Sequence, residues 1–188
     1  MSYRYKTKRE IRKEIYKKLA AQPPSLRGEK SRAIKEKLFQ EKAFQKATCV
    51  MFYVSMDEEV DTCGMIDDTL KMGKRVCVPV IMEHIKELKV SEVRNRLEDL
   101  ERGRYGIYQP KESCERSVPL NDIDVIIVPG VAFDKKNGRI GRGQGYYDRF
   151  LRQLPPDTKK IGLAFDFQVA ESLPTESHDV PLDEIITA

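Results

Sequence analysis

The sequence predicts a single α/β domain of three layers, with helices on both faces of a mostly parallel open sheet. Continuous apolar runs at 48–54, 75–81 and 123–128 have the composition of strands that are buried on both faces. A helical pattern with short connections separates the first two runs, which is typical of a right-handed βαβ unit. The 188 residues show no repeats and no evident linker, so one domain from 1 to 188 is expected.

Composition favours a small anionic ligand over nucleic acid or a membrane. The 34 basic and 30 acidic side chains give a net charge of only +4, with mixed signs. The four cysteines form no C-x-x-C pair, and His84 and His178 lack metal-ligand spacing, so neither disulfides nor a zinc site are expected. Residues 1–20 lack the apolar centre of a signal peptide, and no apolar run approaches a membrane span. These features predict a cytoplasmic protein.

Two amphipathic helices are expected at the start of the chain. Residues 5–21 form the first, because apolar side chains recur every fourth position at Ile11, Ile15 and Leu19. Pro23-Pro24 ends it, and Ser25 can cap the second helix. The apolar positions of that helix are Ile34, Leu38 and, after a break, Phe44.

The middle of the chain supplies the expected βαβ unit. After strand 48–54, Asp61 or Thr62 caps a helix that Gly73 closes, and strand 75–81 follows. Residues 83–120 are less regular. An edge strand is predicted from the apolar residues Ile85, Leu88 and Val90. A loop is predicted from the turn residues Gly103, Gly106 and Pro110.

The last third returns to the sheet. Strand 123–128 precedes a helix from Tyr146 to Leu154, which Pro155 ends, and two further strands are expected at 160–165 and 184–187. Because parallel strands place their carboxyl ends at one edge, the segments that follow them should converge there. These segments are Ser55–Glu59, the region after Val80, and Gly130–Gly145.

The loop after the third strand has the composition of a phosphate-binding loop. Four of the eleven glycines fall between Gly138 and Gly145, with Arg139 and Arg142 among them. Glycines let backbone amides approach a ligand closely, arginines donate to phosphate oxygens, and the start of the next helix favours an anion. At the end of the loop, Asp148 is placed where a carboxylate can hold magnesium.

The loop matches neither common nucleotide-binding pattern. Gly138 and Gly143 have Walker A spacing, but Gln144-Gly145 stands where Lys and Ser or Thr should follow. A Rossmann loop is also excluded, because Gly141 begins a G-x-G-x-G run. A plain turn at Asn137-Gly138 is the remaining structural alternative.

Four segments resemble the 5-formyltetrahydrofolate cyclo-ligase family, also called methenyltetrahydrofolate synthetases. The loop supplies the first, as Gly141-Arg142-Gly143-Gln144-Gly145-Tyr146-Tyr147-Asp148, preceded by Pro129-Gly130-Val131-Ala132-Phe133-Asp134. The others are Lys8-Arg9-Glu10-Ile11-Arg12, the segment 55–62, and His178-Asp179-Val180-Pro181-Leu182-Asp183. The resemblance covers nearly the whole chain and implies an open α/β/α sandwich related to sugar-phosphate isomerases.

The resemblance also implies an activity in one-carbon metabolism. Members of this family convert 5-formyltetrahydrofolate to 5,10-methenyltetrahydrofolate, with ATP as co-substrate and Mg²⁺ as cofactor. The partners expected are therefore these small molecules, not nucleic acid or a membrane, and the protein is expected to be a monomer or a weak homodimer.

Site residues follow from the same resemblance. The residues that bind ATP are expected to be Lys8, Arg9, Glu10, Ile11, Arg12, Arg139, Ile140, Gly141, Arg142, Gly143, Gln144, Gly145, Tyr146 and Tyr147. Those that bind the folate are expected to be Val54, Glu59, Gly143, Gln144, Gly145, Tyr146 and Tyr147, and those that bind the metal are Asp148 and Asp179. Arg142 is the expected catalytic residue. Ile11 replaces the usual Leu, and Gln144 replaces a Lys or Gly of some members, so no lysine in the loop is given a catalytic role.

Some alternatives stay open at this level. Without the resemblance, nothing selects Glu59 from Asp57-Glu58-Glu59, or decides which of Tyr146 and Tyr147 faces the folate. Tyr105 and Tyr108 border the same site or pack elsewhere. A sugar-phosphate isomerase or acyl transferase is a weaker alternative, because Glu59 is its only candidate for an acid or base. A nucleic-acid-binding module is weaker still, because no basic face with interleaved aromatics is evident.

Overall fold

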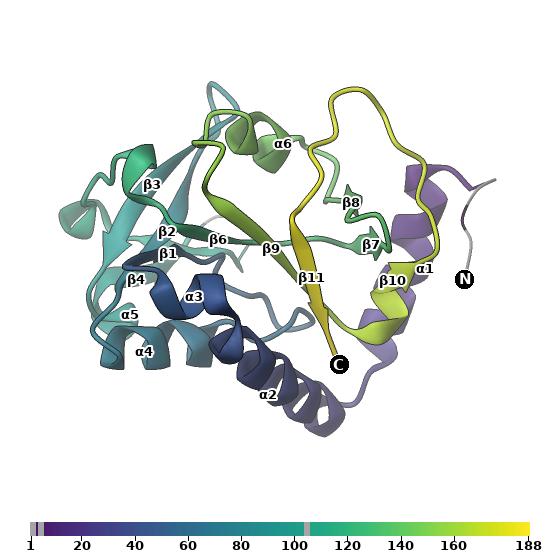
Figure 1. Ribbon diagram of the computed structural model, residues 1–188, viewed down its shortest axis with the longest axis horizontal. Coiled ribbons are helices and arrows are strands. Elements are labelled where there is room, and N and C mark those ends of the chain that lie inside the picture. The colour runs from purple at the N-terminus through teal and green to yellow at the C-terminus, as the bar shows by residue number, and fades with distance from the viewer. Residues whose placement is uncertain (1–2, 4–5, 104–105) are drawn as a thin grey trace.

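A six-stranded, mostly parallel sheet organises the chain in the computed structural model, which describes residues 3, 6–103 and 106–188 (Figure 1). The strand order is β11-β9-β6-β1-β2-β3, and only the β2–β3 pair is antiparallel. The strands of this sheet are β1 (Cys49–Met51), β2 (Arg75–Met82), β3 (Glu87–Val93), β6 (Val125–Val128), β9 (Lys159–Ala164) and β11 (Glu184–Thr187). The predicted mostly parallel sheet is confirmed.

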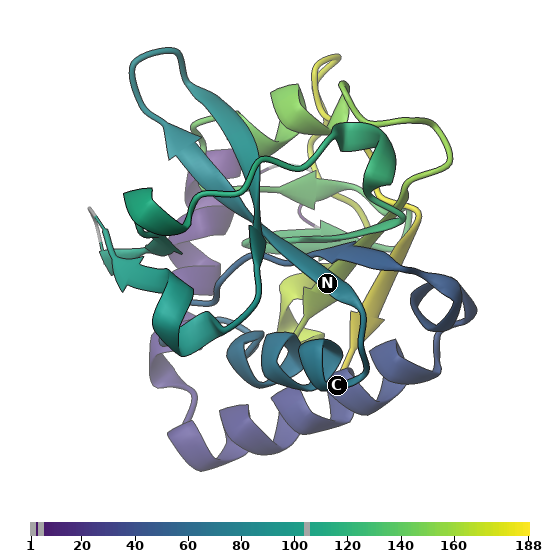
Figure 2. The same cartoon turned by 90° about the vertical axis from the view of Figure 1, so that its left-hand side faces the viewer.

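Helices cover both faces of the sheet (Figures 1 and 2). One core contains apolar side chains of α1, α2, α3 and α4, and the core on the other face contains those of α6. The helices are α1 (Lys8–Ala21), α2 (Pro24–Gln40), α3 (Lys42–Lys46), α4 (Cys63–Lys71), α5 (Arg96–Asp99) and α6 (Tyr146–Leu151). This arrangement confirms the predicted three layers. None of the helices in the described ranges combines the length and apolar composition that a membrane crossing requires.

Two small sheets and several short 3₁₀ turns complete the described part of the fold. The strands are β4 (Leu100–Arg102) paired with β5 (Tyr108–Pro110), and β7 (Ala132–Asp134) between β8 (Arg139–Ile140) and β10 (Val169–Ala170). The 3₁₀ turns are η2 (Glu112–Cys114), η3 (Leu120–Asp122) and η4 (Asp166–Gln168). The β7–β8 hairpin is the structure from which the glycine loop starts.

Helix α1 forms for the reasons that the sequence predicts. Its buried residues are the apolar stripe Ile11, Ile15 and Leu19. It begins at Lys8 instead of residue 5, because Thr7 and Glu10 form a capping box in which each side chain accepts a hydrogen bond from the backbone of the other. The residues at 4 and 5 lie outside the described part of the chain.

Local capping chemistry corrects the predicted start of α2. Ser25 was expected to cap this helix, and that prediction is wrong: the helix starts at Pro24, with Pro23 as the cap residue and no side-chain cap. Proline suits the first helical position because its missing N–H has no helical partner there.

The start of α4 resolves an alternative that the sequence left open. Asp61 Oδ1 accepts a hydrogen bond from the backbone N–H of Cys63 at 2.9 Å. The Thr62 hydroxyl instead donates to the carbonyl of Tyr53 at 2.6 Å. Thr62 is therefore the cap residue by position without a side-chain cap hydrogen bond, and Asp61 accepts the N–H of the first helical residue. Thr62 ties the helix start to Tyr53, two residues after β1.

The βαβ prediction is confirmed, whereas several boundaries shift. Strands β1 and β2 are parallel neighbours joined through α4, with Val50 opposite Val76. Strand β1 is shorter than 48–54, and α6 stops at Leu151 instead of Leu154. Ile85 was expected in the edge strand, but it lies in the β2–β3 turn and is 58% exposed, so that placement is wrong.

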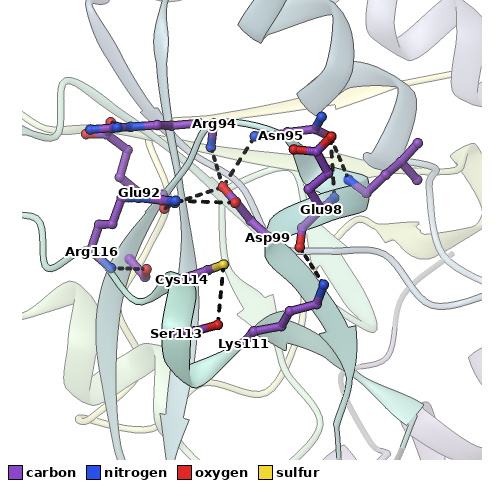
Figure 3. Close-up of polar contacts among 11 residues, drawn as sticks. Glu92, Arg94, Asn95, Glu98, Asp99, Lys111, Ser113, Cys114 and Arg116 are labelled. Carbon is purple, nitrogen blue, oxygen red and sulfur yellow. Dashed lines mark hydrogen bonds and ion pairs between the residues drawn. The ribbon is translucent and has the colours of Figure 1, made fainter.

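Residues 94–103 and 106–118 lie beside the sheet edge, and the buried carboxylate of Asp99 connects both parts of this segment (Figure 3). Asp99 Oδ2 accepts hydrogen bonds from the backbone N–H of Arg94 at 2.8 Å and from Arg116 Nη1 at 2.8 Å. Burial alone would raise the pKa of Asp99, but the hydrogen bonds from Arg116, Arg94 and Asn95 lower it to about 2. The ionised side chain therefore stabilises the fold.

Asp99→Asn is expected to lower the free energy of unfolding at pH 7 by about 2 kcal/mol, since an ordinary aspartate has a pKa of about 3.9. The folded pKa is below the unfolded one, so this stabilisation is complete above about pH 5 and is lost as the pH falls toward 2. Urea unfolding of both proteins between pH 7 and 2.5 checks this, with the exposed Asp157→Asn as control. A difference that does not change with pH would contradict it.

Candidate functional site

A cavity of about 310 Å³ lies beyond the carboxyl ends of the parallel strands. Its wall includes Tyr53 after β1, Gly130 after β6 and Leu163 at the end of β9, together with Tyr16 of α1. Gln168 and the segment Met56–Val60 complete much of the remaining wall. The cavity lies where the parallel topology predicts a ligand site.

Two of the predicted site residues meet at this cavity. Arg142 Nη2 lies 2.7 Å from Glu59 Oε1, although the residues are 83 positions apart. Glu59 Oε2 also accepts a hydrogen bond from the backbone N–H of Met56 at 2.9 Å. The neighbouring Asp57 and Glu58 also line the cavity but are exposed, whereas Glu59 is partly buried and pairs with Arg142.

The glycine loop is held at both ends by arginines. Arg12 Nε donates to the carbonyl of Gly141 at 2.8 Å, which connects α1 to the start of the loop. Arg149 Nη2 donates to the carbonyls of Gln144 and Lys86, at 3.1 and 2.7 Å. The segments after β1, β2 and β6 therefore converge, as expected.

Arg139, unlike Arg142, is built into the protein interior. Its side chain is 2% exposed, and its Nη2 lies 2.7 Å from Asp148 Oδ1. Its Nη1 donates to the carbonyl of Pro129 at 3.1 Å. These contacts place Arg139 and Asp148 as a pair under the loop, and they leave Arg142 as the loop arginine that lines the cavity.

Lys8 and Asp179, which the sequence places 171 positions apart, form an ion pair. Lys8 Nζ lies 2.7 Å from Asp179 Oδ2 and 3.1 Å from Glu176 Oε2. Figure 1 shows the C-terminal loop passing the start of α1. Burial raises the pKa of Asp179, but the hydrogen bonds from Lys8 and from the backbone of Glu176 outweigh it, so the pKa is lowered.

Acidic ligand atoms gather around Asp179 but not around Asp148. Ligand atoms of Glu176, His178 and Asp179 lie within 4.8 Å of one another, the one such group in the described part of the chain. Asp148 is absent from that group and is paired with Arg139. The two predicted metal ligands thus occupy separate ion pairs.

The two tyrosines of the loop have different surroundings. Arg149 lies over the ring of Tyr146, with 5.5 Å to the ring centre. Tyr147 has Arg139 at 5.9 Å from its ring centre. The pKa of Tyr147 is raised, mainly by burial. The positive charge of Arg139 lowers it in part, and the negative charge of Glu59 raises it further. Both tyrosines pack against the core on the α6 face of the sheet, and neither lines the cavity.

Other predicted site residues have structural positions. Val54, Ile11 and Ile140 are buried in the core, and Glu10 belongs to the capping box of α1. Gly143, Gln144 and Arg9 are exposed, whereas Gly145 has the positive φ of 68° that starts α6. Tyr108 is exposed on β5 and Tyr105 lies outside the described residues.

Among the cavity residues that were not predicted from the sequence, three have polar side-chain atoms without a formal charge: Tyr16, Tyr53 and Gln168. Tyr53 lies within an apolar run that predicts a strand, so nothing in the sequence marked it as a site residue. Burial, and to a smaller extent the charge of Glu59, raises the pKa of Tyr53 well above the usual range. Gln168 Nε2 donates to the carbonyls of Gly130 and Val131, at 3.3 and 3.0 Å. One feature of the sequence could have indicated Tyr16: it lies one helical turn after Arg12, so both side chains are on the same face of the helix.

A second hollow, of about 610 Å³, runs along the exposed face of α1. Tyr16 lines both this hollow and the cavity. Its other lining residues include the cations Arg9, Arg12, Lys13 and Lys17. The surface of α1 next to the cavity is therefore basic, which suits anionic ligands.

Comparisons with known proteins identify the family to which the chain is similar. A model described as the 5-formyltetrahydrofolate cyclo-ligase family matches residues 4–188. A Mus musculus protein named 5-formyltetrahydrofolate cyclo-ligase is 30% identical over 189 residues, covering 95% of this chain and 92% of its own. An Escherichia coli K12 protein of the same name is 35% identical over 142 residues, covering 75% of this chain and 78% of its own.

Two solved structures share the fold. The NMR structure of Aquifex aeolicus 5,10-methenyltetrahydrofolate synthetase has a TM-score of 0.84 and 33% identity, covering 96% of this chain and 89% of that chain. The structure of a 5,10-methenyltetrahydrofolate synthetase from Mycoplasma pneumoniae has a TM-score of 0.77 and 26% identity, covering 96% of this chain and 98% of that chain.

Proposed function

The chain belongs to the 5-formyltetrahydrofolate cyclo-ligase family, and we infer that it is a ligase that converts 5-formyltetrahydrofolate to 5,10-methenyltetrahydrofolate with ATP as co-substrate. We propose that residues 1–188 act as one cyclo-ligase domain, with the reaction in the cavity at the sheet edge. The observation that supports this location is the pairing of Arg142 with Glu59 on the cavity wall. The Arg142 guanidinium can bind phosphate, and the Glu59 carboxylate can accept hydrogen bonds from the N–H groups of a pterin.

The reaction needs a phosphoryl transfer followed by ring closure. The formyl oxygen attacks the γ-phosphorus of ATP, and the bond from that phosphorus to the bridging oxygen breaks, so that ADP leaves. Nitrogen 10 then attacks the activated carbon and loses its proton, and phosphate leaves with the former formyl oxygen. Phosphoryl transfer depends mainly on positioning and charge neutralisation, which a short list of cationic side chains can supply.

The geometry gives each side chain a role in this proposal. Arg142 neutralises charge on the transferred phosphoryl group, because it is the loop arginine that faces the cavity. Glu59 accepts hydrogen bonds from the pterin, because its carboxylate lies on the cavity wall. Tyr146 and Tyr147 are proposed as folate contacts from the family resemblance. Arg12 and Arg139 keep the loop in place through Gly141 and Pro129, so their contribution to ATP binding is through loop position.

The residues around Asp179 fit a magnesium ion. Carboxylate oxygens are the ligands that Mg²⁺ prefers, and Asp179 with Glu176 provides two carboxylates beside the phosphate-binding residue Lys8. A bound magnesium ion would neutralise charge on the ATP phosphates. Asp148, in the first turn of α6, is proposed as a metal ligand from the family resemblance alone, because it pairs with Arg139 and lies outside this group of ligand atoms.

Asp179→Asn is expected to raise the Mg²⁺ concentration needed for half-maximal turnover, on the order of tenfold. The physical reason is the loss of one carboxylate charge at the ion. A magnesium titration of turnover at saturating ATP measures this, with Asp157→Asn as a matched control. An unchanged magnesium requirement in a folded Asp179→Asn variant would remove Asp179 from the metal site.

The cellular setting proposed for the protein is a reducing cytoplasm, where it works as a monomer or weak homodimer. Its four cysteines are free, including Cys49 and Cys77, whose sulfurs are 4.0 Å apart. Free thiols suit a reducing compartment. Size-exclusion chromatography with light scattering checks the oligomeric state.

The activity itself has a direct assay. Purified protein with 5-formyltetrahydrofolate, ATP and Mg²⁺ is expected to form the methenyl chromophore, and omission of ATP should abolish it. A folded protein that forms no chromophore under these conditions would overturn the proposed function.

A further inference from the structure

Glu59 and Arg142 serve different substrates in the proposed function, yet they are bonded to each other. Arg142 is assigned to the phosphates of ATP and Glu59 to the pterin. In the structure, Arg142 Nη2 and Glu59 Oε1 are 2.7 Å apart on the wall of one cavity. Each substrate therefore has to separate this ion pair before it can occupy its own position.

Glu59 is the fixed partner of the pair. Its Oε2 accepts the backbone N–H of Met56 at 2.9 Å, and its own N–H donates to the Met56 carbonyl at 3.0 Å. Its side chain is only 19% exposed. These bonds hold the carboxylate in a tight turn at the cavity wall, where it stays whether or not Arg142 is present.

Arg142 is the partner that can move. Its side chain is 47% exposed, and it lies between two fixed points of the loop. Arg12 holds the Gly141 carbonyl on one side, and Arg149 holds the Gln144 carbonyl on the other. Gly143 between them has a φ of 101°, a conformation that glycine adopts without strain. The guanidinium can therefore leave Glu59 by side-chain rotation while the loop stays anchored.

The two substrates compete unequally for this pair. Phosphate oxygens form charge-assisted, often bidentate hydrogen bonds with arginine, so ATP competes well with a single carboxylate for Arg142. The N–H groups of a pterin are neutral donors, so they compete poorly with a guanidinium for Glu59. ATP is therefore the substrate that separates the pair.

We propose that the Glu59–Arg142 ion pair is a latch that closes the pterin position until ATP binds. The proposal rests on the proposed function and adds an order to it. Nucleotide phosphates draw Arg142 away and leave the Glu59 carboxylate free for the folate. By thermodynamic linkage, each substrate then strengthens the binding of the other by the same factor.

The test is the dissociation constant of 5-formyltetrahydrofolate, measured by calorimetry with and without β,γ-imido-ATP and Mg²⁺. The wild-type protein is expected to bind the folate about fivefold more tightly with the nucleotide analogue, the size of one partly exposed ion pair. Arg142→Gln is expected to bind the folate, without nucleotide, as tightly as wild type does with it. In the Arg142→Gln variant, the nucleotide analogue is expected to leave the dissociation constant of the folate unchanged.

A matched control separates the latch from general electrostatics. Lys13→Gln removes one cation from the neighbouring face of α1 without touching Glu59, so the nucleotide effect is expected to persist. Should Arg142→Gln lose its native circular dichroism, Arg142→Lys gives the same test, with a smaller nucleotide effect than wild type because lysine pairs less well with a carboxylate.

The latch is overturned if wild type binds the folate equally with and without nucleotide, or if folded Arg142→Gln binds it more weakly than wild type without nucleotide. These results are distinct from failure of the proposed function. Methenyl formation by wild type together with no nucleotide effect removes only the latch, whereas absence of methenyl formation removes the reaction on which it rests.

Discussion

Replacing Arg142 with alanine is expected to lower turnover by about 100- to 1,000-fold, the cost of one missing donor to a developing oxyanion. Arg142 is the loop arginine on the cavity wall, whereas the buried Arg139 is held by Asp148 and Pro129. Charge on the transferred phosphoryl group would then be left without its nearest cation. Steady-state kinetics at saturating ATP, folate and Mg²⁺ measure the loss.

A matched substitution tests whether the effect is specific to the cavity. Arg152→Ala removes the same charge from an exposed position just after α6 and is expected to keep turnover near wild type. The Arg142→Ala protein should keep its melting temperature, because its side chain is half exposed. Near-normal turnover of Arg142→Ala would remove Arg142 from the reaction.

Glu59→Gln is expected to raise the Michaelis constant for 5-formyltetrahydrofolate by about tenfold or more, while the Michaelis constant for ATP changes much less. A carboxylate accepts hydrogen bonds from two pterin N–H groups, and a hydrogen bond to a charged group contributes about 1.5–3 kcal/mol. Glutamine keeps the shape of the side chain but replaces one acceptor with a donor. Initial rates at varied folate and saturating ATP provide the measurement.

The neighbouring glutamate is the natural control for this variant. Glu58 is exposed and also lines the cavity, but the structure gives it no part in the ion pair with Arg142. Glu58→Gln is therefore expected to leave the folate Michaelis constant within about twofold of wild type, as surface substitutions usually change energies little. If Glu58→Gln had the larger effect, the assignment of the pterin carboxylate would be wrong.

Much of the fold could be predicted because its signals are local. Apolar runs gave the buried strands, and the spacing of Ile11, Ile15 and Leu19 gave the first helix and its buried face. The errors fell where short-range chemistry decides boundaries. Pro24 displaced Ser25 at the start of α2, and the β2–β3 turn took Ile85 out of the edge strand.

The relation to sugar-phosphate isomerase folds, by contrast, stays a prediction. The similar structures are methenyltetrahydrofolate synthetases, and they support the three-layer arrangement without extending it to another class of enzyme.

The candidate site was predicted as a set of segments, and its individual roles were beyond the sequence. A motif states which residues are near one another along the chain, so it could not separate Arg139 from Arg142 or Tyr146 from Tyr147. Burial separates the two arginines: Arg139 forms an ion pair inside the protein, and Arg142 faces the cavity. Gln168 could not be linked to the site from the sequence, because its side-chain amide N–H groups donate to backbone carbonyls 37 and 38 residues away.

The sequence by itself determined the class of fold, the glycine loop and the resemblance to a folate cyclo-ligase, because strand composition, helical spacing and motifs are properties of neighbouring residues. Only the tertiary structure decided that Glu59 meets Arg142 and that Lys8 meets Asp179, at separations of 83 and 171 residues. The physical reason is that charges act through space. Parallel strands bring distant segments to one edge, and the pairing of their side chains is settled only there.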